Sequence, residues 1–423
     1  MSTCDFADRV AALTLTEYRS RTGEHGKGWS GQSVLASFVV QRADGGVEQS
    51  LAAVALGSGT KFMPALAAQT DLIRRCIRDS HAEVIARRSF LRYLQAQIEQ
   101  CADGGAESAE SIFQRSAAGK CELKAGVTFH LYTSSAPCGN ACISKWTKGA
   151  RTQGVSLLPF EYPTAHIVSP DEVTFQAQAE GQISVLAKGS GHSSGQEDAG
   201  DVADGRRAVP PGCSRIAKLE DVVGTDGASL TCSDKIARWN ALGVQGALLM
   251  CFLERPLYLS TVTVGRKFDL LRCQRALCCR LQHFRPATCA ALEGTDFRIH
   301  HVAVMGTHMK LDQGTISTSG VDQGARFGDR CVAWTIGDAR ASEHDGLTGK
   351  SLDDQSETVI STAALFASFV KTVERSVAGR SWLRVPAALD RGCTLAEAKV
   401  ACTAYAKAHA VLMSPASAGG LRA

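Results

Sequence analysis

The spacing of hydrophobic and polar positions changes between a helical and a strand-like period along the whole chain. Apolar residues recur at helical spacing in residues 4–20, 71–100, 232–242, 357–376 and 394–412. Short apolar or β-branched runs predict strands at residues 33–40, 51–57, 127–135, 246–253 and 257–265. Because helices and strands interleave without an internal repeat, the pattern predicts one α/β or α+β domain over residues 1–423.

One segment departs from this pattern. Residues 186–213 are rich in Gly, Ser, Asp and Pro, which predicts a surface insertion or a disordered loop and not a linker between domains. The longest apolar run is interrupted by Glu254 and Arg255, well short of the ~20 residues that a membrane-spanning helix needs. We therefore expect no membrane partner.

Composition narrows the class of protein. Hydrophobic residues make up 44% of the chain and charged residues 21%, which is typical of a globular protein and too apolar for a disordered one. The net charge of +4 argues against a histone-like wrapper, although it permits a local basic face. The 16 cysteines follow no repeating pattern, and no apolar signal segment is visible at the N-terminus. We expect reduced thiols in an intracellular protein of the cytoplasm or nucleus that is not secreted.

Three short motifs carry residues that zinc enzymes need: HAE at residues 81–83, PCGNAC at 137–142 and CSDK at 232–235. A His-x-Glu motif followed later by Pro-Cys is the signature of zinc nucleobase deaminases. A catalytic zinc needs three protein ligands and one open position for water, and imidazole and thiolate suit this ion. His81 and Cys138 are therefore candidate ligands, with Glu83 as the carboxylate that moves protons beside the metal.

The spacing within HAE limits where the motif can lie. Residues two apart on a helix point about 200° apart, so His81 and Glu83 converge only where a helix begins and His81 is still extended. Asp79 and Ser80 favour such a beginning, because both are residue types that cap helix N-termini.

The third zinc ligand has two candidates on spacing alone. The Pro-Cys pair at residues 137–138 is predicted to end a strand and begin a helix, whose N-terminus favours a thiolate. Cys142 can share a helix face with Cys138, and Cys232 is an equal candidate far along the chain. Four other histidines lack comparable neighbours and are predicted to be ordinary core or surface residues, namely His283, His300, His301 and His308.

These motifs and the segments around them resemble the adenosine deaminase (A-to-I editase) domain family, whose members act on tRNA or on double-stranded RNA. The similar segments keep the family order: GSGTK (57–61), DSHAEVIARRSFLRYL (79–94), PCGNAC (137–142), CSDKIARWNALGVQGALL (232–249), PLYLSTVTVG (256–265), VAWTIGD (332–338) and KVACTAY (399–405). The tRNA-specific members are the more similar, through PLYLSTVTVG and GALLM. The resemblance implies a deaminase-type α/β (α+β) fold, with helices flanking a central mixed sheet and a helical C-terminal part packed on it.

The resemblance also implies which residues do the chemistry. In the family the zinc ligands are the histidine of HAE, the cysteine of PCG and the cysteine of CSDK. They correspond here to His81, Cys138 and Cys232, with Glu83 as proton shuttle. Cys142 is then expected to be a packing residue.

The family buries an inositol hexakisphosphate beside its zinc site, and basic residues of this chain fit such an anion. Arg87 and Arg88 follow HAE on one predicted helix, and Lys235 and Arg238 follow Cys232 on another. Helices that hold zinc ligands face the core, so we expect some of these cations to be buried. Buried cations need a counter-anion, which a polyphosphate supplies. On the residues alone, without the resemblance, solvated helix faces are the favoured explanation of these cations.

Further along the chain the match to the polyphosphate site is partial. Lys399 and Tyr405 of KVACTAY match polyphosphate-binding positions of the family, whereas Thr362 and His409 stand where the family has lysines. The chain also ends in SPASAGGLRA, without the Trp-containing and Lys-Pro segment that closes the family's pocket. We therefore expect weaker binding of the polyphosphate, or binding helped by other cations.

The activity that the resemblance implies is zinc-dependent hydrolytic deamination of adenosine to inosine in RNA. The expected substrate is alanine tRNA, at the adenosine immediately 3′ of the anticodon, where a base is unstacked more cheaply than in a duplex. Thr60 and Lys61 of GSGTK resemble residues lining the nucleotide pocket and the RNA entrance, although a tight Gly-rich turn explains them equally. We expect no DNA partner, and the sequence identifies no protein partner.

Three alternatives stay open. The first is editing of double-stranded RNA by the same chemistry, disfavoured because no RNA-binding repeat is visible in the sequence. The second is an inactive deaminase fold that serves as an RNA-binding scaffold, disfavoured because the four catalytic residue types are all present. The third is a deaminase of free nucleosides, which the length of the chain and the resemblance disfavour.

Overall fold

The fold is described from a computed structural model of the chain. The residues that it describes are 3–22, 33–43, 49–62, 74–103, 111–139, 141, 182–186, 214–218, 231–279, 292–309, 311, 330–389 and 392–413.

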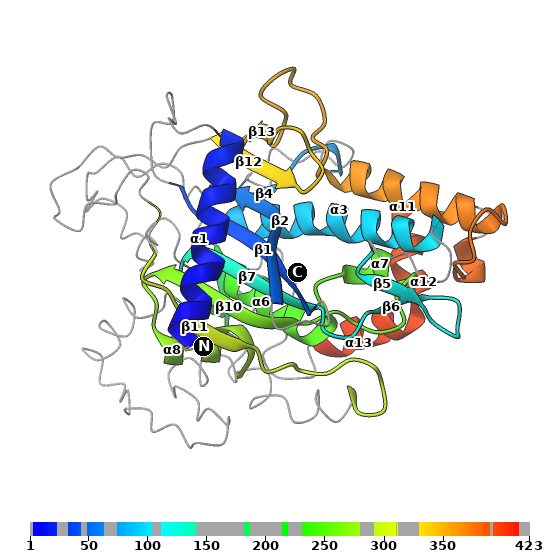
Figure 1. Ribbon diagram of the computed structural model, residues 1–423, viewed down its shortest axis with the longest axis horizontal. Helices are drawn as coiled ribbons and strands as arrows, with labels where there is room; N and C mark the ends of the chain where they lie inside the picture. Colours follow the sequence, from blue (N-terminus) through cyan, green and yellow to red (C-terminus); the bar gives the residue numbers. More distant parts are fainter. Residues whose placement is uncertain are drawn as a thin grey trace, which may run out of the picture.

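A seven-stranded mixed sheet lies at the centre of the molecule (Figure 1). Its strands are β1 (Leu35–Ala43), β2 (Gln49–Ser58), β7 (Thr128–Ser135), β10 (Leu259–Arg266), β11 (Ala303–Gly306), β12 (Arg330–Thr335) and β13 (Ser342–Asp345). Their order across the sheet is β11-β10-β7-β1-β2-β12-β13. The pairs β7–β10 and β10–β11 are parallel and the others antiparallel, which confirms the predicted mixed sheet.

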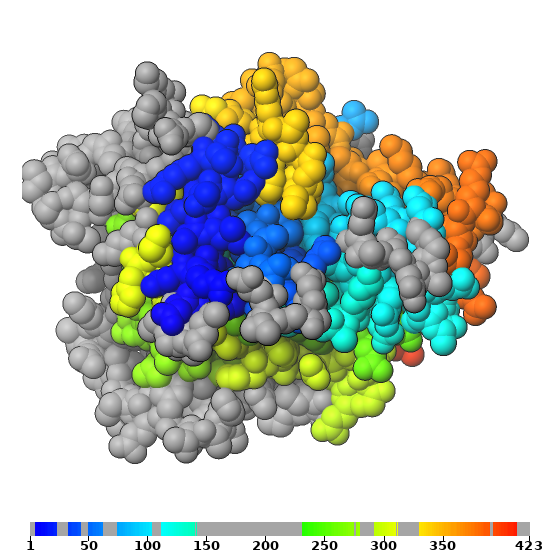
Figure 2. All heavy atoms as spheres, in the orientation of Figure 1, coloured from blue at the N-terminus to red at the C-terminus, as the bar shows by residue number. Residues whose placement is uncertain are grey.

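Helices cover both faces of this sheet, so its central strands are buried on both sides. In β1, Phe38 faces one apolar core and stacks on Phe90 of α3 (Ala82–Asp103), with ring centroids 4.3 Å apart. The next residue, Val39, faces a second core formed with α1 (Thr3–Thr22). This alternation follows from the two-residue period of a strand. Figure 1 shows α1 crossing one face of the strands, and Figure 2 shows it as a ridge on the surface beside β12 and β13.

The remaining elements lie around the sheet. Three short antiparallel pairs are β3 (Thr60–Phe62) with β4 (Asp79–His81), β5 (Phe113–Arg115) with β6 (Cys121–Leu123), and β8 (Gln182–Leu186) with β9 (Ser214–Lys218). The middle helices are α6 (Cys232–Leu242), α7 (Gly246–Met250), α8 (Leu270–Gln274) and the π-helix η4 (Arg275–Cys279). The C-terminal helices are α11 (Thr362–Val377), the 3₁₀-helix η5 (Ala387–Leu389), α12 (Leu395–Ala401) and α13 (Thr403–Met413). They pack on α3, α6 and α7, which confirms the predicted helical C-terminal part.

Three of the predicted elements differ from the structure in type or extent. Residues 246–253 form α7 and a turn instead of a strand, because a short apolar run has the same pattern in a buried helix. The helix predicted over 394–412 is two helices, because Cys402 leaves the helical backbone conformation at φ −81° and ψ 86°. The helical pattern over 71–100 is interrupted by β4: residues 74–75 are helical, and α3 begins at Ala82.

Most of the predicted insertion at 186–213 lies outside the described residues. No helix in the described part of the chain is both long enough and apolar enough to cross a membrane.

Close packing of α3 on β2 depends on Gly57. A Cβ atom there would lie 2.4 Å from the backbone nitrogen of Ala86 and 2.6 Å from Cβ of Ile85. Substituting alanine should push α3 away from the sheet and lower the free energy of unfolding by about 1–3 kcal/mol, despite the lower chain entropy that alanine brings. Chemical denaturation measures the change. Ala52→Ser on the exposed side of β2 is the control, and equal stability of the two variants would contradict this packing.

Candidate active site

The HAE motif lies where β4 ends and α3 begins, as its spacing predicts. His81 is the last residue of the strand, and Glu83 lies in the first turn of the helix. Both side chains are buried. Residues two apart on a strand point to the same side, so Asp79 reaches back to His81. Its Oδ1 accepts hydrogen bonds from the His81 backbone nitrogen at 3.0 Å and from Nδ1 at 2.7 Å.

The two cysteines come from segments far apart in sequence. Cys138 follows the end of β7, and Cys232 is the first residue of α6. The backbone nitrogen of Cys232 donates a hydrogen bond to Sγ of Cys138 at 3.3 Å, and that of Ser233 donates to the carbonyl of Cys138 at 2.9 Å. The Cys138 sulfur therefore lies at the positive end of α6, which favours its thiolate form.

The close approach of these segments requires a glycine after Cys138. Gly139 has φ 98°, and a Cβ atom there would lie 2.1 Å from Oγ1 of Thr231. Thr231 is itself fixed, because it caps α6 in a reciprocal capping box with Asp234. Residue 140 and residues 142–150 lie outside the described part of the chain, so the helix predicted after Cys138 and the place of Cys142 are untested.

The site's charges are strongly coupled. A hydrogen bond between the two sulfur atoms lowers the pKa of Cys138 and raises that of Cys232, so Cys138 is the one of the two that loses its proton more easily. Burial alone would lower the pKa of His81, but the charges of Asp79 and Cys138 raise it to about 9. Burial raises the pKa of Glu83, although His81 opposes the shift. A carboxyl group with a raised pKa is suited to accept and donate a proton near neutral pH.

A buried ion pair connects the two halves of the site. Asp79 accepts a hydrogen bond from Nζ of Lys235 on α6, and both side chains are 11% exposed. Burial would raise the pKa of Asp79, but Lys235 and His81 lower it far below its usual range. Asp79 thus holds His81 on one side and Lys235 on the other.

The donor chemistry of the site fits zinc. Two sulfur atoms and an imidazole are brought together, and Asp79 fixes Nδ1 of that imidazole so that Nε2 remains as its metal-binding atom. Among the described residues, however, one other group of side chains has its three donor atoms within 4.8 Å of one another. This group is Cys278, Cys279 and His301. A metal ion at the predicted site must therefore draw its donors closer.

The predicted substrate residues lie next to this site. Thr60 pairs with His81 across β3 and β4, and Lys61 pairs with Ser80. Lys61 is buried. The Thr60 hydroxyl is also buried and has no hydrogen-bond partner within the described ranges, so it remains able to bond a ligand.

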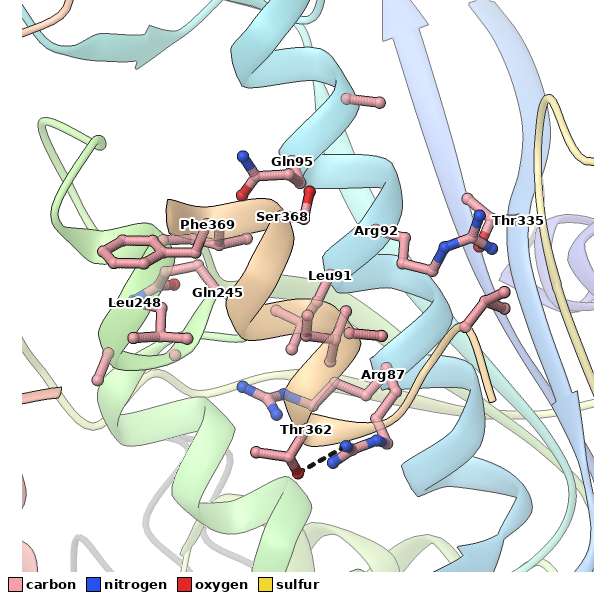
Figure 3. Close-up of a pocket in the computed structure, with 18 of the residues that line it drawn as sticks. Arg87, Leu91, Arg92, Gln95, Gln245, Leu248, Thr335, Thr362, Ser368 and Phe369 are labelled. Carbon is pink, nitrogen blue, oxygen red and sulfur yellow. Dashed lines mark hydrogen bonds between the residues drawn. The ribbon is translucent and has the colours of Figure 1, made fainter. Parts of the chain in front are cut away.

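A cavity of about 480 Å³ lies between α3, α7, α11 and α12 and carries part of the predicted polyphosphate set (Figure 3). Arg87, Arg88 and Lys399 line it. Nε of Arg88 donates to the carbonyl of Ile360 at 2.6 Å, and its Nη2 donates to Oγ1 of Thr362 at 2.9 Å (Figure 3). Thr362 thus binds an arginine of the cavity.

The cations around this cavity repel one another. Burial lowers the pKa of Arg87 to about 10, and the neighbouring charges of Arg238 and Arg88 add to the shift. Burial also lowers the pKa of Lys399, with further lowering from Arg88 and Arg238. Tyr405 lies near both Arg87 and Arg238, since their charges partly offset the rise in its pKa on burial. Three of the six predicted polyphosphate residues thus line the cavity, Arg238 and Tyr405 interact electrostatically with them, and Lys235 pairs with Asp79.

Comparison with known proteins identifies the class. Residues 55–421 match the adenosine-deaminase (editase) domain, and the chain belongs to this family.

Its relatives include both kinds of RNA deaminase. The double-stranded RNA-specific adenosine deaminase of Mus musculus is 31% identical over 66% of this chain, but this chain covers 21% of that relative. The double-stranded RNA-specific editase Adar of Drosophila melanogaster is 27% identical, over 86% of this chain and 46% of its own. The tRNA-specific adenosine deaminase 1 of Homo sapiens is 27% identical over 96% of both chains. The chain thus spans about a fifth of the length of the first of these two double-stranded-RNA relatives and about half of the length of the second.

Two features escaped the sequence-based prediction. Asp79 was expected only as a helix-capping residue, although its place two residues before His81 on a strand indicates a contact. His301 was expected to have no metal-binding neighbours, yet the adjacent Cys278 and Cys279 lie against it. The two adjacent cysteines in the sequence were the feature that could have indicated a metal site there.

Proposed function

We propose that the chain catalyses the hydrolytic deamination of adenosine to inosine in tRNA. The observation that carries this proposal is the buried carboxyl group of Glu83. It is hydrogen-bonded to Cys232 and interacts electrostatically with His81. The chain that holds it belongs to the adenosine-deaminase domain family. His81, Cys138 and Cys232 would hold the zinc ion. Bound there, zinc supplies a water molecule of lowered pKa.

Glu83, Asp79 and Thr60 then have different roles in the reaction. Glu83 takes a proton from the water that attacks C6 of the purine and passes it to the exocyclic amine, which leaves as ammonia. Asp79 keeps His81 in one orientation and tautomer through the Nδ1 hydrogen bond. The buried hydroxyl of Thr60, which pairs with His81 across β3 and β4, would hydrogen-bond the flipped nucleotide.

We propose alanine tRNA as the substrate, at the adenosine immediately 3′ of the anticodon. Alignment with the human tRNA-specific relative over 96% of both chains supports this choice over duplex RNA. An anticodon loop also presents bases that are already partly unstacked. The 31% identity to the double-stranded RNA-specific adenosine deaminase of Mus musculus keeps duplex editing as the second candidate.

The test offers the purified chain three transcribed substrates: alanine tRNA, a tRNA lacking that adenosine, and a perfect RNA duplex. Inosine is read by reverse transcription and sequencing. We expect conversion at the single adenosine of alanine tRNA. Conversion of the duplex alone would favour the second candidate, and no conversion by zinc-loaded protein would favour an inactive RNA-binding scaffold.

We further propose that inositol hexakisphosphate neutralises the cations around Arg87 and Lys399. Lys399→Met then weakens polyphosphate binding and lowers the melting temperature, because the bound anion stabilises the folded state. Without an anion the same change removes a repelling charge and should leave the melting temperature unchanged or raise it. Scanning calorimetry shows whether the melting temperature falls or rises, and native mass spectrometry shows whether the polyphosphate is bound. Lys371→Met on the exposed side of α11 is the control.

A further inference from the structure

A second group of metal-binding side chains lies away from the HAE site. Sγ of Cys278 and Sγ of Cys279 are 3.4 Å apart, and Nδ1 of His301 lies 3.4 Å from the first and 3.5 Å from the second. The sulfur–sulfur separation is far longer than the ~2.05 Å of a disulfide, so these two cysteines are not joined to each other. Three soft donor atoms thus form a nearly equilateral triangle.

The size of this triangle fits a metal ion. Its centre lies about 2.0 Å from each corner, so an ion slightly out of the plane reaches the ~2.0–2.1 Å of a zinc–nitrogen bond and the ~2.3 Å of a zinc–sulfur bond. Thiolate and imidazole ligands select zinc among the common divalent ions. Both cysteines are buried and His301 is half-buried, so an ion here is enclosed by protein on the cysteine side.

The backbone is shaped to bring the two cysteines together. Adjacent side chains on an α-helix diverge by about 100°, which keeps two neighbouring sulfur atoms from facing one partner easily. Cys278 and Cys279 end η4, a π-helix, in which successive side chains diverge less. Such segments are rare and occur frequently at functional sites.

The two segments that carry these donors are both attached to α6. Nδ2 of Asn240 donates a hydrogen bond to the carbonyl of Leu277 at 2.9 Å, and the Asn240 carbonyl accepts one from the nitrogen of His300 at 2.7 Å. One residue of α6 thus holds η4 and the segment before β11 side by side. An ion between Cys278, Cys279 and His301 would join the same two segments beside the helix that carries Cys232.

We propose that Cys278, Cys279 and His301 bind a second zinc ion, which fixes η4 and the segment before β11 against α6. A water molecule or another group completes the coordination on the partly exposed side of His301. This site is independent of the proposed catalytic zinc, since the two share no ligand.

The test counts metal ions in the full chain, expressed with zinc and freed of loosely bound metal. Native mass spectrometry and elemental analysis should give about two zinc ions per chain in the wild type and about one in Cys278→Ser/Cys279→Ser, because serine does not replace a thiolate as a zinc ligand. Cys251→Ser, which removes another buried thiol, should keep the wild-type number. An unchanged number in the double variant overturns the proposal.

A second variant covers the case in which the double variant fails to fold. His301→Asn changes a half-buried side chain and should also lose one zinc ion, with the far-ultraviolet circular dichroism of the wild type. Retention of full zinc content by the folded His301→Asn chain contradicts the site. Cys232→Ser separates the two metal proposals: it should remove the other ion and leave the ion at Cys278 in place, whatever the activity on RNA.

Discussion

Replacing Glu83 by glutamine should reduce deamination by about 10²–10⁴-fold, because glutamine keeps the shape of the side chain and cannot carry the proton. Glu83 is 3% exposed, and burial raises the pKa of its carboxyl group. A group with a raised pKa in the folded state stabilises the fold at low pH and loses that contribution as the pH rises through the folded-state pKa. Neutral glutamine avoids this loss, so the variant should fold at neutral pH as well as the wild type.

Single-turnover formation of inosine on alanine tRNA measures the effect, with zinc content and melting temperature determined on the same preparations. Glu122→Gln on the short strand β6 makes the same chemical change at a residue outside the site and should keep full activity. Wild-type turnover by Glu83→Gln would exclude Glu83 as the proton shuttle. Lost zinc with lost turnover would instead indicate that Glu83 supports metal binding.

Replacing Asp79 by asparagine should lower the free energy of unfolding by about 3–5 kcal/mol, because the buried charge of Lys235 loses its partner. Both side chains are 11% exposed, so water cannot take over the role of the carboxylate. Chemical denaturation at neutral pH measures the loss. Asp103→Asn breaks the ion pair with Arg375, whose side chains are 47% and 43% exposed, and should cost less than about 1 kcal/mol. Equal costs for the two variants would contradict this difference.

The same pair predicts the pH dependence of stability. Lys235 and His81 lower the pKa of Asp79 against the opposing effect of burial. A carboxyl group with a lowered pKa stabilises the fold above its unfolded-state pKa, about 4, and this contribution is lost as the pH falls below that value. The stability gap between the wild type and Asp79→Asn should therefore narrow on the acid side.

Local rules predicted the parts of the molecule that depend on neighbouring residues. The apolar periods placed α1, β1, β2, β7, α6 and β10 close to their observed bounds, and the spacing of HAE predicted that a helix begins between His81 and Glu83. The same rules could not identify α7, because five apolar residues satisfy a strand and a buried helix equally.

Pairings between distant segments were beyond the reach of these rules. The partner of Asp79 is Lys235, which comes close only when α6 packs against β4. The choice between Cys142 and Cys232 stayed open on spacing, because nothing local links residue 138 to residue 232. Cys278 and Cys279 likewise meet His301 only after η4 and the start of β11 lie side by side, so their chemistry follows from the fold and not from a motif.

The first turn of α6 links the thiol pair to the buried ion pair. Cys232 supplies half of the thiol pair, and Lys235, one turn later, supplies the positive charge that Asp79 requires. A molecule in which α6 has come loose loses the sulfur pair and exposes an uncompensated carboxylate in a single step. Loosening of α6 would therefore remove a proposed metal ligand and the partner of Asp79 together, so we expect the two losses to occur in one cooperative step.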